Sequence, residues 1–332
     1  MNEQVTIREL TKEEIDNFSD YKSSYSDTIK SNDSGIIKSK RTFGVELECY
    51  NNKSKKAYVT GLANIHERFG MKSDGTIDGD YCREVVTCKL AGKAGEDALR
   101  HTCNVLYQTG FRADNGSCGT HVHIGVPEAR AMKGEDEKEK RLRLLALFYT
   151  VFDPAILCLI ESNRRTNRFC QPLSQTLVKI DSDKKELLGT WKKYDKLKYA
   201  CENRTEVDTE YIDRRKKSKS LLFHGKYYGI NIGGIYTQRN TLEVRYLGGT
   251  LDPDEILHWI AFHCAIIDTV LLDGITEQEI LKNLYFTREK ELFEKLIELV
   301  KRRLDDETVA NIESRFKKYN KPLPKGEYIN NR

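Results

Sequence analysis

Hydrophobic and polar residues alternate in several short segments of this chain, and such alternation predicts strands with one apolar and one polar face. The first segment is 42–49, in which apolar residues alternate with Glu46 and Glu48. Side chains two residues apart on a strand point to the same side, so the two carboxylates lie together. This pattern fits an exposed edge strand with a charged outer face, and it also fits a pair of ligands for a divalent cation.

A second alternating segment, 118–126, contains two histidines bounded by glycines. His121 and His123 are also two residues apart, so the strand places both imidazoles on one face. Taken alone, the pair fits a half-buried strand with hydrogen-bonded histidines at least as well as it fits a ligand-binding wall.

Two more predicted strands present polar side chains. The segment 82–88 carries one acid, Glu84, and the segment 241–246 carries Glu243 and Arg245 on one face. An acid and an arginine at this spacing fit a surface ion pair, and they also fit a metal ligand beside a group that binds phosphate.

Apolar residues that recur every three or four positions predict helices. The predicted buried or half-buried helices are 96–109, 142–152, 154–161 and 252–272. Charged amphipathic helices are predicted within 277–319, with an apolar stripe of Leu292, Phe293, Leu296 and Leu299. This mixture of strands and helices predicts an α+β fold with a mainly antiparallel sheet.

The composition is that of a soluble globular protein, with 39% hydrophobic and 32% charged residues in a chain of 332. The net charge of +4 is small for this length and does not favour a dedicated nucleic-acid binder. Polar residues interrupt the longest apolar segments, so we expect buried helices and no membrane span. Nine cysteines without a CxxC pair, and no visible secretory signal, predict a reduced, cytoplasmic location.

The predicted strands together bring acids, imidazoles and a guanidinium to one concave face of a sheet. Carboxylate oxygens with one or two imidazoles suit Mg²⁺ or Mn²⁺ better than a structural zinc ion. Cations held by acids beside an arginine can bind the phosphates of ATP and stabilise phosphoryl transfer. The sequence pattern therefore indicates chemistry on a nucleotide phosphate.

Five motifs follow one another between residues 41 and 272. They are F-G-V-E-L-E at 43–48, D-G-T at 74–76 with E-V-V-T at 84–87, C-G-T-H-V-H at 118–123, R…F-C at 164–170, and Y…N, T-L-E-V-R and G-T-L-D within 227–252. In this order they resemble the motifs of the amidoligase family, within the carboxylate–amine ligase superfamily of glutamine synthetase and glutamate–cysteine ligase.

The resemblance implies an α+β, glutamine-synthetase-like catalytic fold, in which a curved, mainly antiparallel sheet is backed by helices and followed by a helical C-terminal appendage. The predicted parts are an N-terminal extension or linker (1–40), the amidoligase-like catalytic domain (41–275) and the appendage (276–332). Within the catalytic domain, the charged insertion 179–220 is a candidate lid.

The resemblance also implies an ATP-dependent ligase that forms an amide or peptide bond through an acyl phosphate. The implied metal ligands are Glu46, Glu48, Glu84, His121, His123 and Glu243. The implied catalytic residues are Arg245, Glu48 and Glu243, and the implied cofactor-binding residues are Arg164, Arg168, Lys226 and Asn231. The expected cofactors are ATP and Mg²⁺ or Mn²⁺, and the expected partners are small-molecule or peptide carboxylates and amines.

Other interpretations stay open. The same strand face fits a related ATP phosphotransferase, and it fits a non-catalytic binding or structural protein that retains the fold. The arginines near 164–168 also fit surface cations at the C-terminal end of a helix. A Cys118 nucleophile activated by His121 or His123 is disfavoured, because residues three or five apart on one strand face opposite sides.

Overall fold

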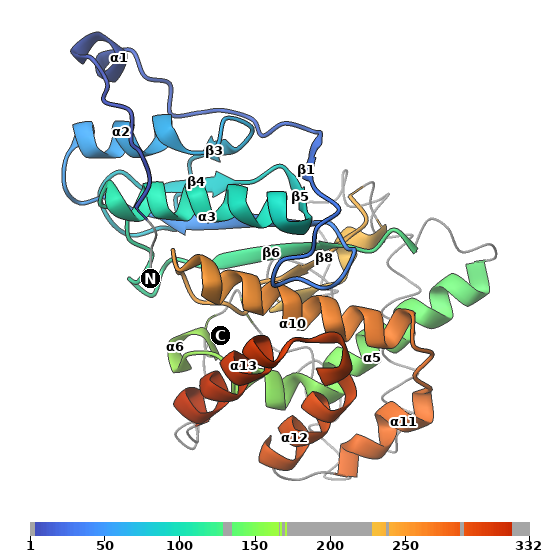
Figure 1. Cartoon of the computed structure of the whole chain (residues 1–332). Coiled ribbons are helices and arrows are strands. Elements are labelled where there is room, and N and C mark those ends of the chain that lie inside the picture. The colour runs from blue at the N-terminus through green and yellow to red at the C-terminus, as the bar shows by residue number, and fades with distance from the viewer. Residues whose placement is uncertain are drawn as a thin grey trace, which may run out of the picture. The chain divides into compact units, whose positions relative to one another are not determined.

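The structure is a computed structural model that describes residues 4–128, 135–165, 167, 170, 228–236, 239–285 and 289–320 (Figure 1). It divides into two units, each treated by itself. The first comprises Met1–Ile124, Tyr246–Cys264 and Leu304–Ile312, and the second comprises Gly125–Arg245, Ala265–Arg303 and Glu313–Arg332. The domain boundaries at residues 40 and 275 stay predictions.

The first unit is built on a mostly antiparallel sheet, as the alternating segments predict. Its strands are β1 (Thr28–Lys30), β2 (Phe43–Cys49), β3 (Gly70–Lys72), β4 (Arg83–Val86), β5 (Lys89–Ala91) and β6 (Thr120–Gly125). Strand β2 is central because it pairs antiparallel with β4, β5 and β6. Strand β3 extends the sheet beyond β4, and β1 runs parallel to β5.

Alternation along β2 separates the hydrophobic core from a polar face. Val45 and Leu47 are each 1% exposed, whereas Glu46 and Glu48 point to the opposite side of the strand. On β6, Val122 lies opposite Val45 and is fully buried, so the apolar face continues from strand to strand. Burial of these side chains fixes which face of the sheet presents the acids.

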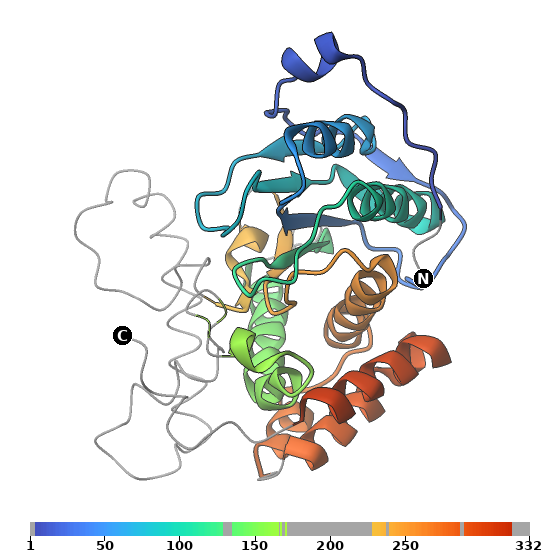
Figure 2. The ribbon, with the colours of Figure 1, turned by 90° about the vertical axis from the view of Figure 1, so that its left-hand side faces the viewer.

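Helices α2 (Lys55–Asn64) and α3 (Gly92–Gln108) lie on the same side of this sheet (Figures 1 and 2). Helix α3 turns Leu99, Cys103 and Leu106 inward, and all three side chains are fully buried. The short helix α1 (Lys12–Asp16) contacts α2. A helix-backed antiparallel sheet in a mixed α+β fold confirms the predicted fold class.

The N-terminal segment 4–40 packs along the first unit. Lys22 and Met71 exchange both of their backbone hydrogen bonds, at 3.0 and 2.8 Å. The buried carboxylate of Glu96 in α3 accepts the backbone N–H of Ile37 at 2.9 Å. Because β1 also joins the sheet, this segment contributes to the folded unit.

The second unit combines helices with a two-stranded antiparallel ribbon. Its elements are α5 (Glu135–Leu157), α6 (Ser162–Arg165), β7 (Ile230–Asn231), the 3-10 helix η3 (Gly233–Tyr236), β8 (Thr241–Val244), α11 (Glu277–Leu281), η4 (Lys282–Tyr285), α12 (Glu289–Val300) and η5 (Lys301–Arg303). Helices α11 and α12 pack against α5. Helices α10 (Pro253–Leu271) and α13 (Asp306–Tyr319) begin in the first unit and end in the second.

The predicted break between helices 142–152 and 154–161 is wrong. Helix α5 continues through Pro154 and ends three residues later, at Leu157. Proline removes one backbone hydrogen bond from a helix, yet Phe152 and Ile156 on either side are fully buried. Packing of these apolar side chains therefore maintains the helix across the proline.

The C-terminal helices follow the predicted pattern with one change. On α12, Leu296 is fully buried as predicted, but Leu299 is only half-buried, and Ile297 and Val300 complete the apolar stripe. The candidate lid at 179–220 lies outside the described residues. Among the residues that are described, no helix is both long and apolar enough to cross a membrane.

Candidate metal-binding site on the sheet

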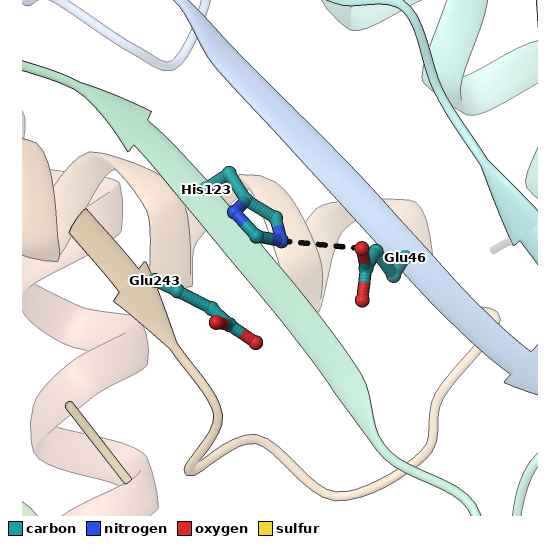
Figure 3. Close-up of side chains that lie close together, drawn as sticks. All are labelled: Glu46, His123 and Glu243. Atoms are coloured by element: carbon teal, nitrogen blue, oxygen red, sulfur yellow. Dashed lines mark ion pairs between the residues drawn. The ribbon is translucent and has the colours of Figure 1, made fainter. Parts of the chain in front are cut away.

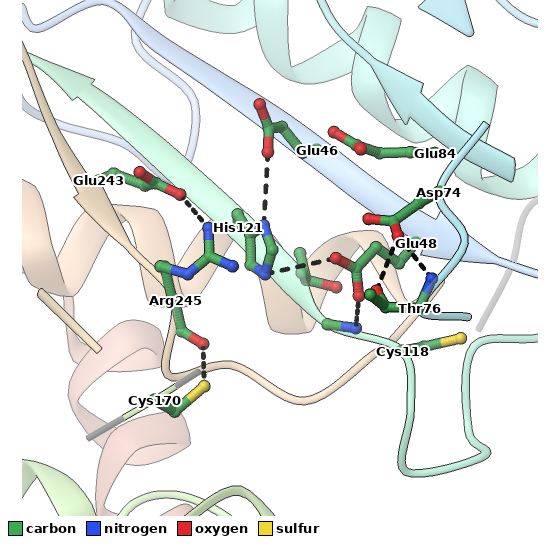
Figure 4. Close-up of polar contacts among 12 residues, drawn as sticks. Glu46, Glu48, Asp74, Thr76, Glu84, Cys118, His121, Cys170, Glu243 and Arg245 are labelled. Atoms are coloured by element: carbon green, nitrogen blue, oxygen red, sulfur yellow. Dashed lines mark hydrogen bonds and ion pairs between the residues drawn. The ribbon is translucent and has the colours of Figure 1, made fainter. Parts of the chain in front are cut away.

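The polar face of the first unit's sheet gathers acids and imidazoles from neighbouring strands (Figure 4). Glu46 of β2 lies directly opposite His121 of β6 in the strand register. Glu48 of β2 lies directly opposite Glu84 of β4. Residues paired in this way in an antiparallel sheet point to the same face, so three strands contribute side chains to one place.

Glu46 contacts both imidazoles. Its Oε2 lies 3.3 Å from Nδ1 of His121, and its Oε1 lies 3.4 Å from Nε2 of His123 (Figure 3). Burial alone would raise the pKa of Glu46, but the hydrogen bonds from the two histidines outweigh burial and hold the pKa well below its usual range. Glu46 is therefore a carboxylate anion at neutral pH.

Glu48 is held by the backbone of β6 and by the same histidine. Its Oε2 accepts the N–H of Gly119 at 2.6 Å, and its Oε1 lies 3.6 Å from Nε2 of His121. The two nitrogens of His121 thus face two different acids, and the ring is buried with 4% exposure. A ring held on both sides keeps the carboxylates of Glu46 and Glu48 at a fixed separation.

Glu84 is paired with a lysine that the sequence pattern did not identify. Nζ of Lys72, on β3, lies 2.8 Å from Oε1 of Glu84 and 3.9 Å from Oε1 of Glu46. Burial and the charge of Glu46 raise the pKa of Glu84 to about 7, against the opposing effect of Lys72. Lys72 could be found only from the register of β3 against β4, because β3 is three residues long.

These side chains form a donor set that suits a hard divalent cation. Carboxylate oxygens of Glu46 and Glu48 lie on either side of the His121 ring on the polar face, and the acids are largely buried. Adjacent buried carboxylates repel each other unless a cation or proton compensates their charge. Oxygen-rich ligation with an imidazole fits Mg²⁺ or Mn²⁺.

The second unit holds a polar network on β7 and β8. Nδ2 of Asn231 donates to Oε2 of Glu243 at 2.8 Å, and Nη1 of Arg245 donates to Oε1 of the same carboxylate at 2.5 Å (Figure 4). Asn231 and Glu243 are register partners on the two strands. Glu243, predicted as a metal ligand, is therefore held from both sides by protein donors.

The end of β8 is anchored by the predicted arginine loop. Nη2 of Arg164 donates to the carbonyl oxygen of Arg245 at 2.7 Å, and the thiol of Cys170 donates to the same oxygen at 3.1 Å. Arg164 is 3% exposed and Cys170 is fully buried. Arg164 was predicted to bind cofactor, and its observed contact is with the backbone of the predicted catalytic arginine.

Two other predicted cofactor-binding residues, Arg168 and Lys226, lie outside the described residues.

Cys118, the disfavoured nucleophile, is 1% exposed. Burial, with the negative charge of Glu48, raises the pKa of the Cys118 thiol to about 12. A thiol that remains protonated at neutral pH is a poor nucleophile, which agrees with the strand geometry.

An α+β fold whose sheet gathers carboxylates and imidazoles on one face defines a candidate metal-dependent enzyme. Residues 68–267 match the model of a family described as "putative amidoligase enzyme", and because this match covers more than half of the chain, the chain belongs to that family. Family membership supports a ligase. The match includes Glu84, the two histidines and Glu243, and it begins after β2. A comparison with curated proteins finds no match.

Proposed function

We propose that this protein is an ATP-dependent carboxylate–amine ligase that forms an amide or peptide bond through an acyl phosphate. The observation that carries the proposal is the placement of Glu46 and Glu48 around His121 on one polar face, in a member of the amidoligase family. Two buried acids around one imidazole are a costly arrangement in a protein without a cation to bind.

The reaction has two steps. An oxygen of the substrate carboxylate attacks the γ-phosphorus of ATP, which forms the acyl phosphate and releases ADP. The nitrogen of the amine substrate then attacks the acyl carbon, the bond from that carbon to the phosphate oxygen breaks, and inorganic phosphate leaves as the nitrogen loses a proton. Both steps need compensation of negative charge and exclusion of water.

In this scheme, each acid and histidine on the polar face of the sheet has a role. Glu46 and Glu48 bind Mg²⁺ or Mn²⁺, and His121 fixes the two carboxylates and adds a ligand nitrogen. The divalent cation neutralises charge on the ATP phosphates when it is bound. His123 and Glu84 are the further predicted ligands on the same face.

Glu243 and Arg245 complete the proposed machinery, an assignment that rests on the T-L-E-V-R motif and the family resemblance. Glu243 is a further metal ligand, and Arg245 donates to the transferring phosphoryl group. Asn231 supports this role because its amide orients the carboxylate of Glu243. Arg168 and Lys226 are proposed contacts for phosphate or substrate.

The first test is thermal unfolding with and without millimolar MgATP. We expect MgATP to raise the melting temperature by about 2–5 °C, because a ligand that binds only the folded state stabilises it. ATP without Mg²⁺ is the matched control and should give a smaller shift. An unchanged melting temperature with MgATP would contradict the proposal and favour a non-catalytic protein.

Product analysis separates the ligase from a related ATP phosphotransferase. The protein is incubated with MgATP and a metabolite extract, and the products are identified by mass spectrometry. A new amide together with ADP and phosphate supports the ligase. A phosphorylated product without a new carbon–nitrogen bond supports the phosphotransferase.

A further inference from the structure

Strand β2 loses its regular pairing at the point where β4 passes into β5. Glu46 pairs with Val86 of β4. The next pair along β2 joins Phe43 to Leu90 of β5. Three residues separate the two partners on the β4–β5 side, whereas two residues separate Glu46 from Phe43 on β2. An extra residue on one side is a β-bulge, which interrupts the hydrogen-bond ladder and changes the direction of nearby side chains.

Thr87, the first residue after β4, holds this bulge together. Its backbone N–H donates to the carbonyl oxygen of Val45 at 3.0 Å, and its hydroxyl accepts the N–H of Val45 at 2.9 Å. A regular ladder would use the carbonyl of Thr87 for the second bond, so the hydroxyl takes the place of a backbone acceptor. Thr87 is 6% exposed and Val45 is 1% exposed, so this bond satisfies a buried N–H.

The bulge lies at the base of a predicted metal ligand, because Val45 comes directly before Glu46. The carboxylate of Glu46 lies 3.3 Å from Nδ1 of His121 and 3.4 Å from Nε2 of His123 (Figures 3 and 4). The register of β6 places His121 directly opposite Glu46. The direction of this carboxylate therefore depends on the backbone that the Thr87 hydroxyl holds.

We propose that Thr87 is a positioning residue for Glu46, because its hydroxyl holds the bulged backbone that directs this carboxylate toward the divalent cation. The inference rests on the proposed function, in which Glu46 is a metal ligand. It also assigns a role to the last residue of the E-V-V-T segment, in which only Glu84 has a role in the proposed scheme. A threonine that served only folding stability would leave cation affinity unchanged in the folded protein.

The test is titration of the full-length protein with Mn²⁺ alone, followed by the electron paramagnetic resonance signal of free Mn²⁺. Thr87→Val keeps the shape of the side chain and removes the hydroxyl, so it should weaken Mn²⁺ binding by at least about fivefold. Thr87→Ser keeps a hydroxyl and should stay within about twofold of the wild type. Thr87→Ala also lacks the hydroxyl and serves as the test variant if Thr87→Val fails to fold.

A double variant tests whether Thr87 acts through Glu46. Glu46→Gln alone should weaken Mn²⁺ binding by at least about tenfold, because it removes the charge of a ligand. In the Glu46→Gln background, Thr87→Val should weaken binding by less than about twofold more, since the carboxylate that it positions is already gone.

Thr109→Val is the matched control for the loss of a buried hydroxyl. Thr109 also lies in the first unit with 9% exposure, and its hydroxyl donates to the carbonyl oxygen of Val105 at 2.7 Å. Urea unfolding without metal should show a lower midpoint in both Thr87→Val and Thr109→Val. Mn²⁺ affinity should fall only in Thr87→Val, which separates positioning from a general loss of stability.

Two results would overturn the inference. Mn²⁺ affinity within about twofold of the wild type in folded Thr87→Val would leave Thr87 a purely structural role. A further loss in the double variant as large as that in Thr87→Val alone would show that the hydroxyl does not act through Glu46. The proposed function fails separately, since its failure would appear as a wild-type protein that binds no Mn²⁺.

Discussion

At the scale of single residues, the first unit's site depends on one imidazole that contacts two acids. His121 contacts Glu46 with one ring nitrogen and Glu48 with the other, whereas Nε2 of His123 contacts Glu46. His121 is also the more buried ring, with a side-chain exposure of 5% against 17% for His123. The two histidines therefore differ both in their contacts and in their burial.

Glu48→Gln is expected to lower the rate of metal-dependent ADP release by at least about 100-fold while leaving the fold intact. The amide oxygen of glutamine can still accept the N–H of Gly119, but the charged ligand is lost. The measurement is ADP release with MgATP, with circular dichroism as the check on folding.

Cys118→Ser is the matched control for Glu48→Gln, because Cys118 lies on the same buried part of the chain next to Gly119. Its activity should stay within about threefold of the wild type, since a thiol with a pKa near 12 takes no part in catalysis. Complete loss in Cys118→Ser would instead support a thiol mechanism, and retained ADP release in Glu48→Gln would make the metal assignment wrong.

At the scale of elements, the arginine loop and the end of β8 act together. Arg164 and Cys170 both donate to the carbonyl oxygen of Arg245, and Arg245 in turn holds Glu243. A part-buried carbonyl with two donors is fixed in direction, and the fixed backbone positions the side chains on either side of it. We expect Arg164 and Cys170 to affect catalysis through Arg245, without contact with the phosphates.

Cys170→Ala tests this relation because it removes one donor with little change in volume. The loss of one hydrogen bond is worth about 1 kcal/mol, so kcat should fall by about fivefold while KM for MgATP stays unchanged. Cys170→Ser keeps a donor and should restore kcat. Equal kcat in the two variants, or a rise in KM alone, would contradict a positioning role.

Long elements with a clear period of hydrophobic residues could be predicted from the sequence, and short elements could not. The alternation in β2 and β6 indicated both strands and the face on which Glu46 and His121 lie. Strands β1, β3 and β5 have three residues each, too few to show a period, so Lys72 was missed with β3. Strand register, which brings Glu48 opposite Glu84, depends on tertiary pairing that no local pattern encodes.

At the scale of the whole molecule, one buried histidine links folding stability to pH. His263 on α10 is fully buried, and its ring packs edge-on against Trp259 and Phe262 at centroid distances of 4.6 and 5.3 Å. Burial lowers the pKa of His263 from its ordinary value of 6.5 to about 3. The ring is therefore neutral in the folded protein at pH values where it is protonated in the unfolded chain.

The sign of the effect follows from this difference in proton binding. Below pH 6.5 the unfolded state binds one more proton than the folded state, so the free energy of unfolding decreases as the pH falls, until the folded pKa near 3 is reached. Between pH 7 and pH 5 the contribution of His263 lowers the free energy of unfolding by about 2 kcal/mol.

His263→Phe removes the titrating group and keeps an aromatic ring in the same apolar surroundings. Urea unfolding at both pH values should therefore show a decrease that is smaller by about 2 kcal/mol in His263→Phe than in the wild type. The comparison isolates His263, because both proteins share every other titrating group, and equal pH dependence in the two would mean that this histidine is protonated in the folded state.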